Sequence, residues 1–200
     1  MNRLAEHLER AVANGAAATS DFDLDDAKIK GKGTLLRPAG VLLAIEVHQS
    51  EPTILLTKRS SALRHHPGQI AFPGGKVDDG DVGPEGAALR EAWEEVGLPQ
   101  DLPHVIGALS PHETVTGFQV TPFVALLKRP FDVVPEQGEV SEVFRVPLHH
   151  VLELENFSIQ SRRWRGQTRK YYTIPFGPYY IWGATARMLR HFAEKMALTK

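Results

Sequence analysis

One stretch of the sequence, residues 84–98, constrains the fold most strongly because it predicts a helix with two unlike faces. Pro84 suits the first helical position, and Gly97 suits the position just beyond the last turn. At about 100° per residue, the acidic residues fall within an arc of ~100°, and the apolar residues occupy the opposite side. The acidic residues are Glu91, Glu94 and Glu95, and the apolar residues are Leu89, Ala92, Trp93 and Val96. We therefore expect a helix over residues 84–96 that buries its apolar face and presents its carboxylates on the other.

Carboxylates this close together on one helix face repel one another unless a positive charge lies between them. Glu91 and Glu95 are spaced i,i+4, and like-charge pairs at this spacing destabilise a helix by roughly 0.2–0.5 kcal/mol. Arg90 can pair with Glu94 one turn further on, which offsets the repulsion only in part. A bound dication would remove it, and hard oxygen ligands suit Mg²⁺ or Mn²⁺ rather than zinc. Taken alone, the stretch leaves two interpretations open, a metal site and a solvated acidic face.

The rest of the chain predicts short strands and helices in mixed order, which indicates an α/β protein of the α+β type. Apolar residues at helical spacing predict a short helix over residues 2–13, and the Gly-, Ala- and Asp-rich residues 14–34 predict a mobile connection. Residues 58–81 show little periodicity and predict a long functional loop. We expect strands at residues 41–47, 53–57, 104–109, 120–127, 156–160 and 170–174, and helices at residues 147–154 and from Ile181 to Met196.

Composition narrows the functional classes. The chain of 200 residues is long enough for a single core, and we expect residues 1–200 to form one domain. A net charge of −1 predicts no large surface for DNA or RNA. The absence of cysteine excludes disulfides and thiolate metal ligands, and it fits a cytoplasmic protein. No apolar run approaches the ~20 residues that a membrane span needs, so we expect no membrane contact. The assembly stays open, with a homodimer as one option.

The acidic helix belongs to a longer pattern. Ahead of it lies Phe72-Pro73-Gly74-Gly75, and the helix itself reads Arg90-Glu91-Ala92-Trp93-Glu94-Glu95-Val96-Gly97-Leu98. This arrangement resembles the Nudix box, which is a glycine, five residues, Glu, seven residues, and then R-E-U-x-E-E-x-G-U, where U is apolar. Asp81 stands where Glu is usual, and eight residues rather than seven separate it from Arg90.

A second motif lies just upstream, where residues 55–74 read LLTKRSSALRHHPGQIAFPG. It resembles the L-L-T-x-R-S-x-x-L-R-x-H-x-G-x-x-x-F-P-G motif of the coenzyme A pyrophosphatase branch of the Nudix family, whose members also have the extra residue and the Asp. Residues 181–187, which read IWGATAR, resemble this branch as well. The resemblance implies the Nudix fold, a mixed β-sheet sandwiched between helices with a loop–helix–loop box. It also implies metal-dependent hydrolysis of coenzyme A and its derivatives to 3′,5′-ADP and (acyl-)4′-phosphopantetheine.

The two motifs together suggest roles for the glutamates. Glu91 and Glu95 are the first choice for direct ligands of Mg²⁺ or Mn²⁺, and Glu94 is either a third ligand or the group that activates water. Arg90 is expected to orient a carboxylate. Nudix enzymes often place a further catalytic or metal-binding Glu in a later loop, and Glu139 is our candidate, with an exposed acidic loop as the alternative.

The loops suggest how substrate is held. Gly74 and Gly75 would let the backbone approach the metal or the phosphate closely, although a plain tight turn explains them equally well. Arg59, Arg64 and His66 lie in the coenzyme A motif, and guanidinium groups match phosphate geometry. Surface salt bridging is the alternative for each of these three residues.

Two other functions compete with coenzyme A hydrolysis. One is Nudix hydrolysis of another nucleotide, such as ADP-ribose, NADH or a nucleoside triphosphate, since the box alone cannot separate these substrates. The other is a nucleotide-sensing module that binds without cutting, which the three intact glutamates disfavour. Other chemistries lack their motifs, because the sequence has no G-x-x-x-x-G-K-[ST], no H-E-x-x-H and no G-x-S-x-G.

Overall fold

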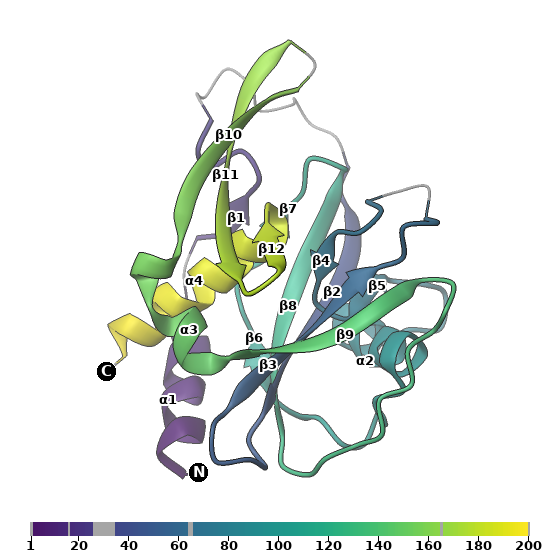
Figure 1. Cartoon of the computed structure of the whole chain (residues 1–200). Helices are drawn as coiled ribbons and strands as arrows, with labels where there is room; N and C mark the ends of the chain where they lie inside the picture. The colour runs from purple at the N-terminus through teal and green to yellow at the C-terminus, as the bar shows by residue number, and fades with distance from the viewer. Residues whose placement is uncertain (1, 16, 26–34, 64–65, 165, 200) are drawn as a thin grey trace.

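The fold is a large mixed sheet with helices on both faces and a smaller sheet packed beside it (Figure 1). The computed structural model describes residues 2–15, 17–25, 35–63, 66–164 and 166–199. The helices are α1 (Asn2–Ala13), α2 (Gly83–Val96), α3 (Leu148–Leu152), a 3₁₀ turn (Leu154–Asn156) and α4 (Ala184–Leu198). The strands are β1 (Thr19–Ser20), β2 (Arg37–Glu46), β3 (Thr53–Arg59), β4 (Ile70–Ala71), β5 (Gly74–Lys76), β6 (His104–Ala108), β7 (His112–Glu113), β8 (Phe118–Leu127), β9 (Val140–Pro147), β10 (Ser158–Trp164), β11 (Gln167–Phe176) and β12 (Tyr179–Trp182). The predicted mixed sheet between helices is confirmed.

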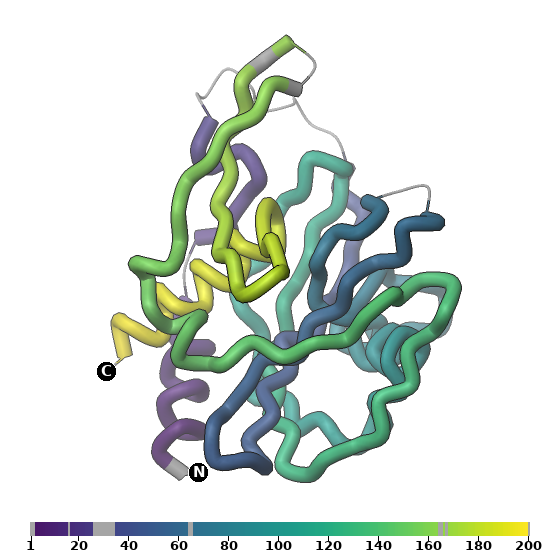
Figure 2. The backbone as a smooth tube through the Cα atoms, viewed as in Figure 1, coloured from purple at the N-terminus to yellow at the C-terminus, as the bar shows by residue number. Residues whose placement is uncertain are grey.

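The large sheet is built around the parallel pair β2 and β8, which stay in register over their full length. The main path runs β1-β7-β8-β2-β3-β4, with β5 on β2, β6 on β8 and β9 on β3. Strands β10, β11 and β12 form a separate antiparallel sheet. In Figures 1 and 2, α2 lies on one side of the large sheet, and α1 and α4 lie on the other.

Two hydrophobic clusters hold these layers together, one on each face of the sheet. Side chains alternate along a strand, so β2 sends Leu42 and Ala44 toward α2, and Leu43 and Ile45 toward α1 and α4. All four are fully buried. Burying a Leu or Ile side chain contributes roughly 1.5–3 kcal/mol, so this alternation fixes which face of β2 meets α2.

Two different strands, β3 and β5, pair with the same edge of β2, and this arrangement determines where Gly74 and Gly75 lie. The last residues of β2 pair with the start of β3, whereas its first half pairs with β5, from Ala39 opposite Lys76 to Val41 opposite Gly74. The backbone N–H of Leu42 donates to the carbonyl of Pro73 at 2.8 Å, which extends this pairing. Strand β5 therefore inserts between β2 and β3 and carries Gly74 and Gly75 to the surface of α2.

Helix α2 begins and ends as the sequence predicts, but it is rotated about its axis. Proline lies in its first turn, and Gly97 closes it in the left-handed conformation, with its N–H bonded to the carbonyl of Trp93. The buried face includes Ala92, Val96 and also Glu95, which is only 4% exposed. Trp93 is 53% exposed, so the expectation that it faces the core is wrong. The small alanines let the helix lie close to β2, and this approach brings an acidic side chain into the interface.

Several short strands were not predicted from the sequence, because each has few residues and no usable periodicity. Residues 58–81, expected to be one long loop, contain β4 and β5. Ile181 belongs to β12, and the last helix starts only at Ala184. Strand β9 was not predicted either. Helix α1 coincides with its predicted range, and the predicted strand ranges other than residues 156–160 fall almost entirely within β2, β3, β6, β8 and β11. Residues 156–160 overlap only the start of β10.

The mobility expected for residues 14–34 stays a prediction, and the structure shows contacts between residues 19–25 and the rest of the chain. Strand β1 pairs with β7, and Thr19 Oγ1 lies 2.9 Å from Nδ1 of the buried His112. Asp23 pairs with Arg187 of α4, and Asp25 pairs with Arg169 of β11. These contacts join residues 19–25 to the body of the protein. Residues 16 and 26–34 lie outside the described residues. In the described part of the chain, no helix is long and apolar enough to cross a membrane.

Candidate active site

Glu95 lies at the centre of the candidate site, where α2 meets β5. Its Oε2 accepts a hydrogen bond from the backbone N–H of Gly74 at 3.2 Å, and its Oε1 lies 3.9 Å from a guanidinium nitrogen of Arg59. Burial disfavours the charged carboxylate and raises the pKa of Glu95 to about 8. The nearby charges of Glu91 and Glu139 raise this pKa further, while the Gly74 N–H and Arg59 lower it. A charge buried with so little compensation is typical of functional sites.

Glu91 lies one turn before Glu95 and presses against Gly75. A Cβ atom on residue 75 would lie 2.4 Å from Oε1 of Glu91, so only glycine leaves room for this side chain. Gly74 has a φ of 149°, and a Cβ there would lie 2.4 Å from the carbonyl oxygen of Gly40. Burial raises the pKa of Glu91, and Arg90 counteracts this shift. Gly74 is therefore needed for the close approach of β5 to β2, and Gly75 for its close approach to α2. Both roles are more specific than a place in a tight turn.

Arg90 holds the acidic side of the site together. Its Nε and one Nη donate to both oxygens of Asp81, at 2.9 and 3.0 Å. Its other Nη donates to Glu91 at 3.0 Å and to Glu94 at 2.8 Å. This fork lowers the pKa of Asp81 and raises that of Arg90. Asp81 was not predicted as a site residue, because the sequence distinguished it only by its position in the Nudix-box pattern.

Glu94 and Glu139 differ in what they face. Glu94 is exposed, and its carboxylate accepts a hydrogen bond from Arg90. Glu139 comes from the loop before β9, and its charge raises the pKa of both Glu91 and Glu95. Its backbone carbonyl accepts a hydrogen bond from the N–H of Ser60 at 2.7 Å. The structure thus brings Glu139 toward the carboxylate pair and leaves Glu94 at the rim.

The upstream motif of residues 55–74 contributes Arg59, the last residue of β3, to the site. The register between β3 and β9 shifts between Lys58 and Arg59, and such irregularities re-aim the side chain that follows. Arg59 thereby reaches Glu95, while its backbone pairs with Gln69. His66 lies exposed in the same loop with a φ of 54°, a conformation uncommon outside glycine. Arg64 lies outside the described residues.

The donor groups of this site suit a hard divalent cation. Glu91 and Glu95 supply carboxylate oxygens with raised pKa values, and Glu139 adds a third negative charge nearby. In the described part of the chain, no three His, Asp or Glu side chains already converge as a metal cage. The pair beside Gly75 is the arrangement that fits a cation, because a positive charge there would stabilise the ionised carboxylates that burial, and to a lesser extent the neighbouring negative charges, disfavour.

Known proteins are similar to this chain in sequence. A family profile described as NUDIX domain matches residues 36–165. A protein of Escherichia coli (strain K12), named Uncharacterized Nudix hydrolase NudL, is 43% identical over 179 residues, which are 90% of this chain and 93% of that protein. Its namesake in Enterobacter sp. (strain 638) is 38% identical over 191 residues, covering 90% of this chain and 98% of that protein.

Two solved structures are similar in fold. The MutT protein from Methanosarcina mazei Go1 has a TM-score of 0.50 at 22% identity, covering 81% of this chain and 93% of that one. The NUDIX domain of Shewanella oneidensis NrtR, solved with ADP ribose, has a TM-score of 0.51 at 15% identity, covering 87% and 94%. At these identities the likeness concerns the arrangement of strands and helices alone.

Proposed function

The chain belongs to the Nudix family and is a pyrophosphohydrolase, and on this premise we propose that its substrate is coenzyme A, including acyl derivatives. The products would be 3′,5′-ADP and (acyl-)4′-phosphopantetheine. The observation that carries the proposal is the position of Arg59, because it joins the coenzyme A motif to the glutamate helix at 3.9 Å. Arg59, from the upstream motif, thus lies beside the carboxylate of Glu95, from the Nudix box.

Enzymes of this family use divalent metal ions, and we propose Mg²⁺ or Mn²⁺ for this chain, held by Glu91 and Glu95. When bound, the cation supplies positive charge that polarises the pyrophosphate and makes water a better nucleophile. The chain itself keeps both carboxylates in place, since the Gly74 N–H holds Glu95 and Arg90 holds Glu91. Asp81, in turn, holds the Arg90 guanidinium group in position by accepting hydrogen bonds on both of its carboxylate oxygens.

Glu139 is proposed to take the proton of the attacking water. It stands on a different element from the metal-binding pair, and its exposed carboxylate can turn toward substrate. Glu94 is less suited to this task because Arg90 already engages it at 2.8 Å. Arg59 and Arg64 are proposed to hold phosphate groups, with His66 at the rim of the same loop. A kcat that falls at least ~100-fold in Glu139→Gln with unchanged KM would support this assignment.

Hydrolysis of another nucleotide is the second candidate, because a Nudix structure of the same fold was solved with ADP ribose. Turnover of coenzyme A, ADP-ribose, NADH and nucleoside triphosphates should be compared with Mg²⁺ and with Mn²⁺. We expect the highest kcat/KM for coenzyme A. A higher value for any other member of the panel would refute the proposed substrate, and binding without any turnover would favour a nucleotide sensor. We also propose that the protein works in the cytoplasm.

A further inference from the structure

The small sheet of β10, β11 and β12 carries an unusual charge pattern. Between Glu155 and Glu194 the sequence contains no acidic residue. The same interval contains five basic residues on or between β10 and β11, namely Arg162, Arg163, Arg165, Arg169 and Lys170. Arg162, Arg163 and Lys170 have exposed side chains, and this local excess of positive charge, in a chain whose net charge is only −1, favours an anionic ligand.

Aromatic rings and a guanidinium group lie together on one face of this sheet. The guanidinium carbon of Arg162 lies 4.8 Å from the centre of the Trp182 ring, and Tyr171 meets the same ring edge-on at 5.2 Å. The hydroxyls of Tyr171 and Tyr180 lie 3.4 Å apart, and Tyr180 is 47% exposed. We call these four residues the hairpin face. It combines flat apolar rings with a positive charge, the combination that binds the π-surface and phosphate of a nucleotide.

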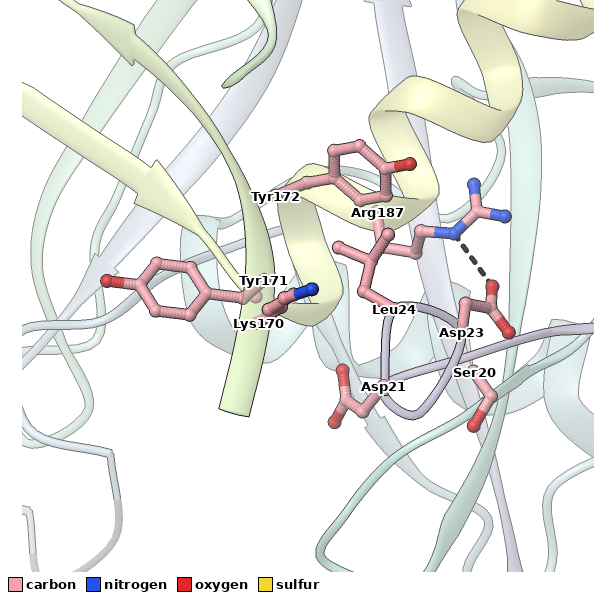
Figure 3. A pocket seen from close by; sticks show the side chains of 9 residues that line it. Ser20, Asp21, Asp23, Leu24, Lys170, Tyr171, Tyr172 and Arg187 are labelled. Carbon is pink, nitrogen blue, oxygen red and sulfur yellow. Dashed lines mark hydrogen bonds and ion pairs between the residues drawn. The ribbon is translucent and has the colours of Figure 1, made fainter. Parts of the chain in front are cut away.

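The hairpin face points away from the core. Side chains alternate along β11, and Figure 3 shows Tyr171 and Tyr172 directed to opposite sides, with Tyr172 beside Arg187 of α4. Arg190 also lies over the Tyr172 ring, at 4.8 Å. The inner face of the sheet is thus occupied by α4, whereas Tyr171 and Arg162 are turned toward solvent.

Arg162 also differs from the other arginines near this sheet. Arg169 pairs with Asp25, and Arg187 pairs with Asp23, so each neutralises a carboxylate of the residues around β1. Among the described residues, no carboxylate lies within ion-pair distance of Arg162, whose side chain is exposed. Its charge is therefore available to an anionic ligand.

The hairpin face connects to the candidate active site through one loop. Strand β12 lies beside β4 (Figure 1). The side-chain amide of Gln69 lies 3.9 Å from the position that a Cβ atom of residue 183 would take, directly after Trp182. The backbone carbonyl of Gln69 accepts from the N–H of Arg59, whose guanidinium group faces Glu95. A substrate with its pyrophosphate at Glu95 could thus extend across this loop onto the hairpin face.

We propose that the hairpin face binds the purine nucleotide half of the substrate, with the base stacked on the aromatic rings and a ribose phosphate beside Arg162. This inference rests on the proposed function, because coenzyme A places an adenine and a 3′-phosphate on one side of the pyrophosphate. The pantetheine half would then leave the site in another direction. The face adds affinity and purine specificity at a distance from the bond that is cut.

The test is direct binding of the two products by calorimetry. In Arg162→Gln and in Tyr171→Leu, the Kd of 3′,5′-ADP should rise about 10- to 100-fold, the range for loss of one stacked ring or one charge-assisted bond. Binding of 4′-phosphopantetheine should not change, and Tyr171→Phe, which keeps the ring, should bind 3′,5′-ADP within ~3-fold of wild type. Arg163→Gln is the matched control, since it removes the same charge from the neighbouring position, whose side chain alternates to the other face. Thermal unfolding verifies that each variant is folded.

Unchanged binding of 3′,5′-ADP by both Arg162→Gln and Tyr171→Leu would overturn the proposal, as would an equal loss in Arg163→Gln. Binding of an oligoadenylate through these residues, without binding of 3′,5′-ADP, would also overturn it and indicate a nucleic-acid surface instead. Turnover of coenzyme A by the unaltered chain is measured separately. If that turnover is absent while the variants still weaken 3′,5′-ADP, the proposed substrate is wrong and the hairpin face is supported.

Discussion

Replacing Glu95 by Gln should make the metal-free protein more stable at alkaline pH. Burial raises the pKa of this carboxyl from 4.5 to about 8 in the folded chain. Between these values the unfolded chain is ionised while the folded chain keeps its proton, so the free energy of unfolding should fall as pH rises from about 5 to about 8. At ~1.4 kcal/mol per pKa unit, this shift sets an upper limit of roughly 5 kcal/mol. We expect ~1–3 kcal/mol, because water and side-chain rearrangement screen part of the charge.

Urea unfolding in the presence of EDTA, at pH 5.5 and pH 8, measures this effect. The wild-type chain should lose stability between the two values, and Glu95→Gln should remove most of that loss, since the amide oxygen can still accept the Gly74 N–H bond. Glu94→Gln is the matched control, because it makes the same change on the same helix at a side chain that is 52% exposed. The same Glu95→Gln variant should lose at least ~100-fold in turnover, so stability and activity move in opposite directions. An identical pH dependence in wild type and Glu95→Gln would refute the reasoning.

Further predictions concern the cation, the glycine contact and the phosphate. EDTA should abolish turnover and Mg²⁺ or Mn²⁺ should restore it, with activity rising from neutral to alkaline pH because ionised carboxylates and a partly deprotonated water favour the attack; full activity after chelation, or an optimum near pH 5, would contradict this. Gly75→Ala should lower kcat at least ~10-fold, because a Cβ would lie 2.4 Å from Oε1 of Glu91, whereas Gly86→Ala in α2, where the nearest atom to a Cβ would lie at an ordinary 3.6 Å, serves as the control. Arg59→Ala should lower kcat/KM about 10- to 100-fold on coenzyme A and on dephospho-coenzyme A alike, because its guanidinium group lies beside Glu95, where the pyrophosphate would bind; a loss confined to coenzyme A would show that Arg59 holds the 3′-phosphate instead.

The limits of the glutamate helix α2 could be predicted from the local sequence. Pro84 and Gly97 act on the backbone of their own turn, so the limits of α2 follow from the sequence to within one residue. The family, too, follows from the order of residues in the two motifs, because the profile matches residues 36–165. The choice of Glu91 and Glu95 as the metal-binding pair likewise came from the motif and stays a prediction. What these positions share is that their signal lies within one continuous stretch of the sequence, residues 55–98.

The rotation of α2 could not be predicted in this way. Counting apolar residues placed Trp93 inside, but the space against β2 admits only small side chains, so Ala92 enters and Trp93 stays 53% exposed. That rotation buries Glu95, and its burial raises the pKa to about 8. The short strands β4, β5 and β12 depend in the same way on partners far away in the sequence, since a strand of two to four residues has no independent stability.

Sequence alone therefore determined the acidic residues, the glycines and the limits of the helix, because each depends on local backbone chemistry. Only the tertiary structure decided that the charge of Glu139 lies near the carboxylate pair, that Asp81 accepts hydrogen bonds from Arg90, and that Arg162 lies over the Trp182 ring. These contacts join side chains whose strands and loops are brought together by the pairing of β5 with β2 and by the packing of β12 beside β4. Electrostatic energies depend on distance and burial, and both quantities are set by the folded chain rather than by the order of its residues.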